Sequence, residues 1–292
     1  MSTSRELIVP PESAGARLDA WLAEALAGIS RAAAAALVDS GAVRVDGQAR
    51  PKGAKLRGGE HVTVAEPAVE REPAKVPESA IVWENEELWV IDKPAGLVVH
   101  PAPGHRGVTL VEWLAERFPG SEPHAVHRLD RDTSGLMLVA KGAAAQLELQ
   151  AALRRREVVR EFLALLSGKL ESRSGTIDAP LGRDVRRRTV MSTRTDRPRE
   201  ARTHFEVERF TGDHTLVRAR LETGRTHQIR AHFAAIGHPV AGDRAYGGAD
   251  TLGIGRQFLH SHRLGLREQE WRSALPEDLA AALRRADAGT ER

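Results

Sequence analysis

The sequence predicts an α+β protein whose main sheet is largely antiparallel. Short apolar runs recur along the chain as candidate strands, and only a few stretches have the apolar spacing of an amphipathic helix. The regular alternation of strand and helix that marks a parallel α/β sheet is missing. A phosphate-binding glycine loop is missing too, because Gly253-Ile254-Gly255 alone is too weak a signal.

Length and one polar seam divide the chain into two candidate domains. At 292 residues the chain exceeds the roughly 100–150 residues of a typical domain. Residues 65–80 (AEPAVEREPAKVPESA) contain three prolines and alternating charges without periodicity, which is typical of a linker. We therefore expect a small domain over 1–66, a linker over 67–80 and a larger domain over 81–292.

The small domain has the pattern of two helices followed by a hairpin. Leu18, Trp21 and Leu22 share one helical face. Ser30 suits the N-cap of a second helix, which Gly41 would end in a left-handed conformation, and Asp46-Gly47 predicts a tight turn. The expected elements are helices over 17–27 and 31–40 and strands over 42–45 and 61–64.

The large domain mixes strands and helices in no simple repeat. Residues 135–140 (GLMLVA) are too apolar to be anything but a buried strand. Its other expected strands cover 81–83, 88–92, 161–166, 204–210, 214–221 and 258–266, and its expected helices cover 110–118, 143–157 and 276–285.

Composition excludes several classes of function. Cysteine is absent, which rules out disulfides, zinc–cysteine sites and thiol catalysis. The sequence has neither an apolar run long enough for a membrane span nor a signal-peptide core, so we expect a cytoplasmic protein with no membrane partner.

The positive charge of the chain is almost all arginine. The net charge is only +3, but 37 of the 43 basic residues are arginines, the side chain best suited to phosphate and base contacts. Residues 44–57 carry five basic residues against one acid, and residues 183–202 carry eight arginines against three acids. Both segments are candidate RNA contacts, the second as a clamp or mobile hairpin, and ordinary solvated loops are the alternative.

The densest polar segment is residues 125–138 (AVHRLDRDTSGLML). Asp130 precedes the buried strand, and Arg128 and Arg131 flank it. Guanidinium groups favour the ionised form of a carboxylate, which could then act as a nucleophile or base without a metal. A surface ion pair is the plain alternative. Asp130-Arg131-Asp132-Thr133 also resembles the motif of a metal-dependent phosphatase, although no apolar strand directly precedes it.

Two further segments carry candidate chemistry. Residues 222–243 (ETGRTHQIRAHFAAIGHPVAGD) predict a helix that Thr226 caps, with Ile229 and Phe233 facing inward and Arg230 on another face. Its histidines lack the spacing and the acidic partner of a zinc site, so we expect no metal. Residues 160–168 (REFLALLSG) add Phe162, for which core packing is the simplest role.

The small domain resembles the RNA-binding domain named after ribosomal protein S4. The matching residues are RLDAWLAEAL, SRAAAAALVDSGAVRVDG and GGEHVTV, between positions 17 and 64. The resemblance implies RNA binding by the second helix and the following hairpin, with Arg31 as a contact. Arg44, in the basic segment 44–57, is a second candidate RNA contact.

The large domain resembles the RluA family of RNA pseudouridine synthases. WVIDKPAGLVVHP, HRLDRDTSGL, TGRTHQIRAH, GHPVAGDRAYGG and FLHSHRLGL match the family's motifs in order, from about residue 84 to 266. Together with the S4-type domain, they point to the RluD-like branch, which acts on large-subunit ribosomal RNA.

This resemblance implies a role for each site residue. Asp130 would be the catalytic aspartate and Arg128 would fill the space left by the target base. Arg230 would pair with the aspartate, and Ile229 would pack beside the base. Phe162 departs from the family, which has tyrosine there, so any step that needs the hydroxyl is in doubt.

The family's reaction needs neither a metal nor a cofactor, and a monomer is expected. In the arginine-rich segment 183–202, Arg186, Arg187 and Arg188 are candidate RNA ligands. Lys93 has two readings, a phosphate contact or a solvated strand end. The alternatives to catalysis are an RNA-binding assembly factor that has lost the tyrosine, and the phosphatase.

Overall fold

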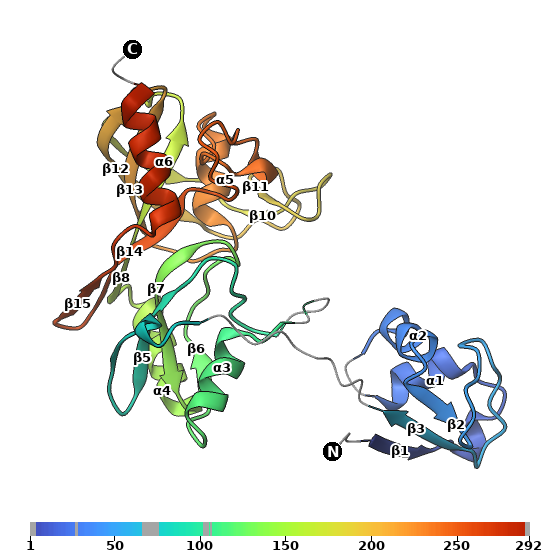
Figure 1. The fold of residues 1–292 in the computed structure, drawn as a ribbon. Coiled ribbons are helices and arrows are strands. Elements are labelled where there is room, and N and C mark those ends of the chain that lie inside the picture. The colour runs from blue at the N-terminus through green and yellow to red at the C-terminus, as the bar shows by residue number, and fades with distance from the viewer. Residues whose placement is uncertain (1–3, 27–28, 66–75, 102–104, 106, 290–292) are drawn as a thin grey trace. The chain divides into compact units, whose positions relative to one another are not determined.

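The computed structural model describes residues 4–26, 29–65, 76–101, 105 and 107–289. It divides into two compact units, Met1–Arg71 and Glu72–Arg292 (Figure 1). Most of the expected linker lies outside the described residues. Its end, Glu78–Ala80, is a 3₁₀ helix in the second unit, with Ala80 buried in the core. No helix in the described ranges is long and apolar enough to span a membrane.

The first unit packs two helices on a three-stranded antiparallel sheet. The sheet order is β1-β3-β2. Ser30 Oγ accepts the amide of Ala33 at 3.2 Å, and Gly41 takes a φ of 78°, so both expected caps of the second helix are present. Its elements are β1 (Ser4–Ile8), η1 (Pro11–Ser13), α1 (Leu18–Ala25), α2 (Arg31–Asp39), β2 (Val43–Val45) and β3 (His61–Ala65).

Buried leucine, valine and tryptophan side chains form the core of this unit. Leu18, Trp21 and Leu22 of α1 all lie within it, as their helical spacing predicted. Strand β1 was not predicted, and its Ile8 is 63 % exposed. The strand joins the sheet through its backbone pairing with β3. Because this pairing does not depend on side chains, the sequence of β1 shows little apolar pattern.

The second unit is built on a ten-stranded sheet with the order β4-β5-β7-β14-β8-β13-β12-β9. Strands β6 and β15 pair with β7 and β14 beside this path. Every pairing is antiparallel except that of β7 with β14, so the α+β prediction is confirmed. The strands are β4 (Ile81–Glu84), β5 (Leu88–Lys93), β6 (Pro123–Ala125), β7 (Ser134–Lys141), β8 (Val158–Ser167), β9 (Ser174–Asp178), β12 (Arg202–Thr211), β13 (His214–Leu221), β14 (Leu259–Leu266) and β15 (Gln269–Arg272).

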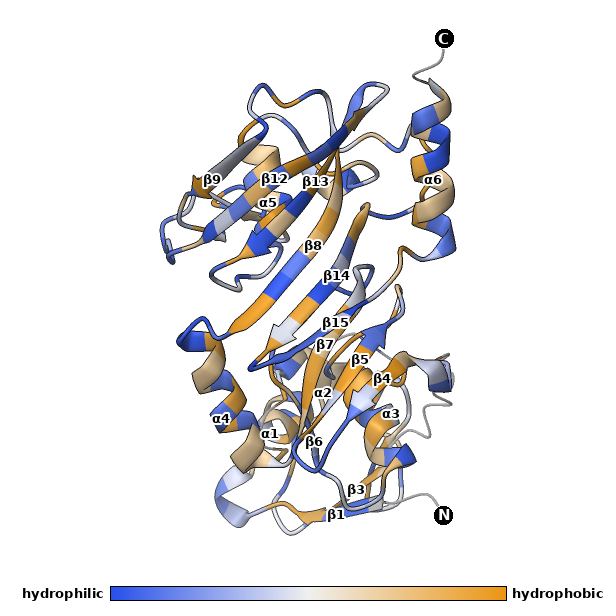
Figure 2. Cartoon of the chain, turned by 90° about the vertical axis from the view of Figure 1, so that its left-hand side faces the viewer, coloured by the Kyte–Doolittle hydropathy of each residue, from blue (hydrophilic) through white to orange (hydrophobic). Residues whose placement is uncertain are grey.

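Strand β7 is the buried centre of the lower part of this sheet. Figure 2 shows apolar residues along β5 and β7. Alternate residues of β7 serve two cores: Met137 packs in the cluster that includes α3, and Leu138 in the one that includes α4. At the start of β7, a Cβ on Gly135 would lie 2.3 Å from the carbonyl oxygen of Ser261, so the parallel pairing with β14 requires glycine there.

Four helices and a small two-stranded sheet complete the unit. Helix α4 ends three residues before the predicted end, because Arg156 takes a positive φ of 63°. Strands β10 and β11 pair antiparallel and form a short hairpin whose loop is residues 184–190, and residues 193–201 lie outside it. The elements are α3 (Leu110–Arg117), α4 (Ala143–Arg154), α5 (Gln228–Ala235), α6 (Glu277–Ala288), η3 (Arg244–Tyr246), β10 (Gly182–Arg183) and β11 (Met191–Ser192).

Candidate active site

Asp130 lies in the loop between β6 and β7. The carbonyl of Asp130 accepts the amide of Thr133 at 3.1 Å, which forms a tight turn before β7. Buried Lys93 fixes this loop from behind, since its Nζ donates to the carbonyls of Pro94, Leu97 and Arg131 at 2.8–2.9 Å. Burial lowers the pKa of Lys93 to about 7. The prediction of a solvated strand end is therefore wrong, because Lys93 is fully buried and its Nζ donates to three carbonyls of the chain.

The partner of Asp130 comes from a distant part of the chain. Arg230 of α5 donates from Nη1 to Asp130 Oδ2 at 2.9 Å. The neighbours Arg128 and Arg131 make no ion pair with Asp130, and Arg131 instead contacts Gly96 and Asp132. The carboxylate is thus held by one guanidinium from α5, not by the two that flank it in sequence.

Arg230 is itself fixed by a second carboxylate. Its Nε and Nη2 donate to Asp243 at 2.6 and 2.9 Å, and both side chains are buried. Burial alone would lower the pKa of Arg230, but Asp243 and Asp130 outweigh it and raise the pKa above its ordinary value. Arg230 therefore stays charged and bridges the two carboxylates.

The helix that carries Arg230 does not begin as predicted. Thr226 does not cap it; His227 precedes the first turn with a left-handed φ of 53°. No side chain among the described residues caps the helix; Gln228 instead fixes the loop before it, because its Oε1 accepts the amide of Arg225 at 3.0 Å and the hydroxyl of Thr223 at 2.8 Å. Ile229 faces inward as predicted and is buried.

The only tyrosine of the chain, Tyr246, completes the site. Its Oη accepts the amide of Met191 at 2.8 Å and lies 3.0 Å from Nδ1 of His227. Burial raises the pKa of Tyr246 to about 12, so the hydroxyl keeps its proton and is able to donate it to Nδ1. Burial also lowers the pKa of His227, which favours the neutral ring, and its Nε2 lies 3.9 Å from Asp130 Oδ1.

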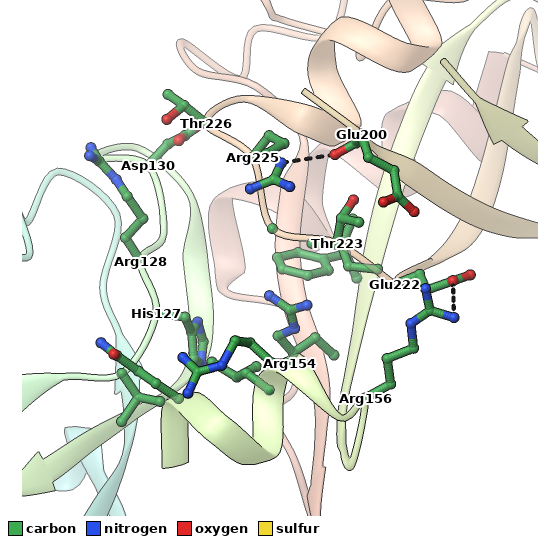
Figure 3. Close-up of a pocket in the computed structure, with 17 residues that line it drawn as sticks. His127, Arg128, Asp130, Arg154, Arg156, Glu200, Glu222, Thr223, Arg225 and Thr226 are labelled. Atoms are coloured by element: carbon green, nitrogen blue, oxygen red, sulfur yellow. Dashed lines mark hydrogen bonds and ion pairs between the residues drawn. The ribbon is translucent and has the colours of Figure 1, made fainter. Parts of the chain in front are cut away.

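Two adjoining cavities open at Asp130. The larger, of about 460 Å³, has Asp130 and Thr226 at one end and Arg154 and Arg156 at the other (Figure 3). The smaller, of about 50 Å³, is lined by Asp130, Phe162 and Ile229 among others. The predicted residues that line one or both cavities, or contact Asp130 directly, are Arg128, Asp130, Phe162, Ile229 and Arg230.

The other predicted residues lie outside this cluster. Arg31 and Arg44 are exposed in the first unit, where Arg31 donates to Asp19 and Arg44 to the carbonyl of Gly47. The Arg17 hydrogen bond lowers the pKa of Asp19 to about 2. Arg186, Arg187 and Arg188 are exposed on the loop between β10 and β11.

Sequence reasoning missed Asp243, Tyr246 and the buried Arg160. Both Asp243 and Tyr246 belong to GHPVAGDRAYGG, which was recognised as a motif without a role for either residue. That Tyr246 is the only tyrosine was the one available signal. In the part of the chain that the structure describes, no three histidine or acidic side chains are arranged to hold a metal ion.

The antiparallel sheet with its arginine-lined cavity at Asp130, and the small unit with its basic segment over residues 44–57, fit an enzyme that acts on RNA. Residues 87–235 match the family model of RNA pseudouridylate synthases, and residues 16–62 match that of the S4 domain. The chain belongs to the RNA pseudouridylate synthase family and carries an S4 domain. The resemblance that its motifs carry is therefore confirmed.

Named relatives and a solved structure agree with this assignment. The chain is 42% identical to ribosomal large subunit pseudouridine synthase D of Nitrosomonas europaea, over 95% of this chain and 86% of that one. The protein of the same name from Xanthomonas campestris is 44% identical over 90% and 85%. Human RNA pseudouridylate synthase domain containing 1 superposes with a TM-score of 0.57 and 28% identity, over 70% of this chain and 86% of that one.

Proposed function

We propose that this enzyme converts specific uridines of large-subunit ribosomal RNA to pseudouridine, with Asp130 as the catalytic carboxylate. The observation that carries the proposal is the position of Asp130, paired with Arg230 at the mouth of a cavity that Phe162 and Ile229 also line. The printed names of the relatives supply the ribosomal large subunit as the source of the RNA.

The reaction requires the base to leave its stack before any bond changes. Unstacking costs a few kcal/mol, and an aromatic contact with the base returns roughly 1–3 kcal/mol. Phe162 supplies that aromatic face, Ile229 an apolar one, and Arg128 lies at the rim to occupy the space left in the RNA. The glycosidic bond then breaks, the uracil turns, and carbon 5 joins the sugar.

Asp130 would act in one of three ways: by attack on the anomeric carbon, by attack on the pyrimidine ring, or by removal of a sugar proton to give a glycal. Each needs an ionised carboxylate. Arg230 donates to Oδ2 at 2.9 Å, and Nε2 of His227 lies 3.9 Å from Oδ1. The hydroxyl that tyrosine would place at position 162 is absent, so the proposed chemistry proceeds without it.

The remaining arginines would bind the RNA strand. Arg31 and Arg44 serve the S4 domain, and Arg186, Arg187 and Arg188 serve the loop beside the site. Arg187 Nη1 lies 3.5 Å from the carbonyl of Ala245, next to Tyr246, so this loop adjoins the site. We also propose that the enzyme works as a monomer, because one chain supplies every side chain of the site. We further propose that it acts in the cytoplasm.

One assay tests the proposal. Ribosomal RNA that lacks pseudouridine is incubated without divalent metal, and pseudouridines are mapped chemically. We expect product from the wild type, none from Asp130→Asn, and unchanged RNA affinity in both. Asp132→Asn is the matched control, because its half-exposed carboxylate lies in the same loop and makes its ion pair, among the described residues, with Arg131 and not with Arg230.

Three other results would contradict the proposal. Equal product from Asp130→Asn would remove the aspartate from the mechanism. Tight binding without product from either protein would favour an assembly factor. Activity on a phosphorylated small molecule that appears only with magnesium would favour the phosphatase.

A further inference from the structure

Arg160 is a buried arginine without a hydrogen-bond partner among the described residues. It lies on β8, two residues before Phe162 and therefore on the same face of the strand, roughly 7 Å away. Its side chain is only 7 % exposed and lines the 460 Å³ cavity. Among the residues that the structure describes, none accepts a hydrogen bond from its guanidinium, and its Nε is buried without a partner.

A buried guanidinium without a hydrogen-bond partner is unusual in a folded protein. Arg230 is buried to the same degree, yet it makes three hydrogen bonds to two carboxylates. A buried charge without a partner costs stability. Burial lowers the pKa of Arg160 to about 10, so the group still carries its charge at neutral pH. The folded chain therefore contains a cation that needs an anion from outside.

The rest of the cavity wall does not neutralise Arg160. Arg154 and Arg128 also line the cavity and pair with no acid in the described residues. Arg156 is paired with Glu222, and Arg225 Nε donates to the carbonyl of Glu200, as Figure 3 shows. Among the described residues, the cavity therefore keeps an excess of unpaired guanidinium groups, with Arg128 beside Asp130 and Arg154 at the other end.

The two carboxylates at the other wall do not reach Arg160 either. Glu222 is held by Arg156, Arg202 and His204. The Glu200 carboxylate lines the cavity but makes no ion pair with a described residue. Loss of solvent lowers the pKa of His127 to about 3, so this neighbour is neutral and neither adds to nor screens the charge of Arg160.

We propose that Arg160, with Arg154 beside the same cavity, binds one backbone phosphate of the RNA next to the nucleotide at Asp130. This inference rests on the proposed function. The forked guanidinium donates two parallel hydrogen bonds to phosphate oxygens, a geometry that lysine cannot reproduce. A base packed on Phe162 places its own strand within reach of the neighbouring Arg160. Phosphate binding would then position the target nucleotide rather than select its sequence.

The first test separates a ligand role from a structural one. Arg160→Met removes the unpaired charge but keeps a long apolar side chain. If Arg160 waits for a phosphate, the free variant should melt at a higher temperature than the wild type, and its affinity for unmodified ribosomal RNA should fall about ten-fold or more. The slope of log affinity against log salt should fall by about 0.7–0.9.

Two further variants serve as controls. Arg160→Lys keeps the charge without the fork, so it should restore the salt slope but only part of the affinity. Arg284→Met removes an exposed arginine of α6 that is paired with Glu277, and it should leave affinity and slope unchanged. An unchanged slope in Arg160→Met would overturn the proposal, and so would a lower melting temperature combined with wild-type affinity.

The second test locates the phosphate. Single neutral methylphosphonates are placed along the RNA segment that the wild type protects from cleavage. We expect one position to weaken binding by the wild type and to have no further effect on Arg160→Met. If no position behaves in this way, the RNA assignment is wrong. If inorganic phosphate alone stabilises the wild type and not the variant, the site belongs to a free phosphate instead.

These measurements also stand apart from the proposed reaction, because they record binding and not isomerisation. A protein that makes no pseudouridine but shows the coupled methylphosphonate position would refute the proposed function and keep the phosphate site. A protein that makes pseudouridine, but for which no methylphosphonate position distinguishes the wild type from Arg160→Met, would keep the proposed function and refute the phosphate site.

Discussion

Asp243 holds Arg230 through two hydrogen bonds, of 2.6 and 2.9 Å, and so fixes the one remaining edge of the guanidinium that reaches Asp130. Asp243 is 2 % exposed and is followed at once by the 3₁₀ turn η3. The pair between Asp130 and Arg230 therefore depends on a residue that touches neither the cavity nor the proposed substrate.

Asp243→Asn should slow catalysis while RNA affinity stays unchanged. The amide accepts only one of the two hydrogen bonds and places a donor opposite Arg230, which shifts the guanidinium. Since a shift of about 1 Å can cost on the order of 100-fold, we expect a 10- to 100-fold lower single-turnover rate. Asp132→Asn controls for a simple loss of charge near the site. A wild-type rate in Asp243→Asn would show that Arg230 keeps its position without Asp243.

Tyr246→Phe tests the hydrogen bond to His227. The ring that lies 5.0 Å from Arg230 Cζ remains, but the amide of Met191 and Nδ1 of His227 each lose a partner. Without the hydroxyl, the proton of the neutral imidazole is free to occupy Nδ1 and leave Nε2. We expect a stability loss of about 1–2 kcal/mol in chemical unfolding and a rate reduced about three- to ten-fold. An unchanged rate with the expected loss of stability would limit Tyr246 to a structural role.

Phe162→Tyr asks whether the missing hydroxyl limits the reaction. Phe162 is 5 % exposed and lines both cavities. If a hydroxyl there would assist a proton transfer, turnover should rise, by as much as the 10²-fold typical of a general acid or base. Lower turnover with unchanged RNA affinity would show that the pocket is shaped for phenylalanine. Phe162→Leu, which removes the aromatic face, should weaken RNA binding in either case.

The loop arginines 186, 187 and 188 should govern salt dependence and not stability. Asp184 accepts the backbone amides of Arg186 and Arg187 at 2.8–2.9 Å, so the loop keeps its shape without their side chains. Replacing all three with glutamine should leave the melting temperature unchanged and reduce the salt slope of RNA binding by up to about 2. An unchanged slope would show that these side chains do not touch phosphate.

Acid should destabilise the second unit through His260. This side chain is 1 % exposed, and burial lowers its pKa to about 4. Because the unfolded chain binds the proton more tightly, the free energy of unfolding is highest above about pH 6.5 and falls as the pH drops toward 4, by at most roughly 3 kcal/mol.

His260→Gln is the matching variant. Glutamine keeps a group that can accept from Ser134 Oγ, the hydroxyl 3.0 Å from Nδ1 of His260, but it does not titrate. The acid slope between pH 6.5 and 4 should flatten in this variant when unfolding is followed by denaturant at each pH. An identical slope in both proteins would assign the acid sensitivity to other groups.

Secondary structure could be predicted wherever apolar spacing was strong. Strand β13 matches its predicted bounds, and α3, β7 and β14 differ by one or two residues. The misses occur where the backbone, and not an apolar pattern, makes the element. Strand β1 depends on its ladder with β3, and α5 begins at a left-handed histidine that no propensity would choose.

The site itself shows where reasoning from one sequence ends. Asp130 and Arg230 were expected to meet, but only a family resemblance could say so, because 100 residues separate them. Arg128 and Arg131 were predicted to be the positive charges beside Asp130, because a sequence shows only which residues are close along the chain. Arg160 carried no signal at all, because the absence of a partner is a property of the folded chain.

Tyr246 gives the site a reporter of its own. A chain with one tyrosine shows one tyrosine resonance when that amino acid is isotopically labelled, and no assignment by mutagenesis is needed. The Tyr246 ring lies against Arg230, and its hydroxyl joins Met191 of the β10–β11 sheet to His227 of the site. In the intact protein, a change in the Tyr246 resonance on addition of RNA would therefore show that binding at the arginine loop alters the surroundings of Asp130.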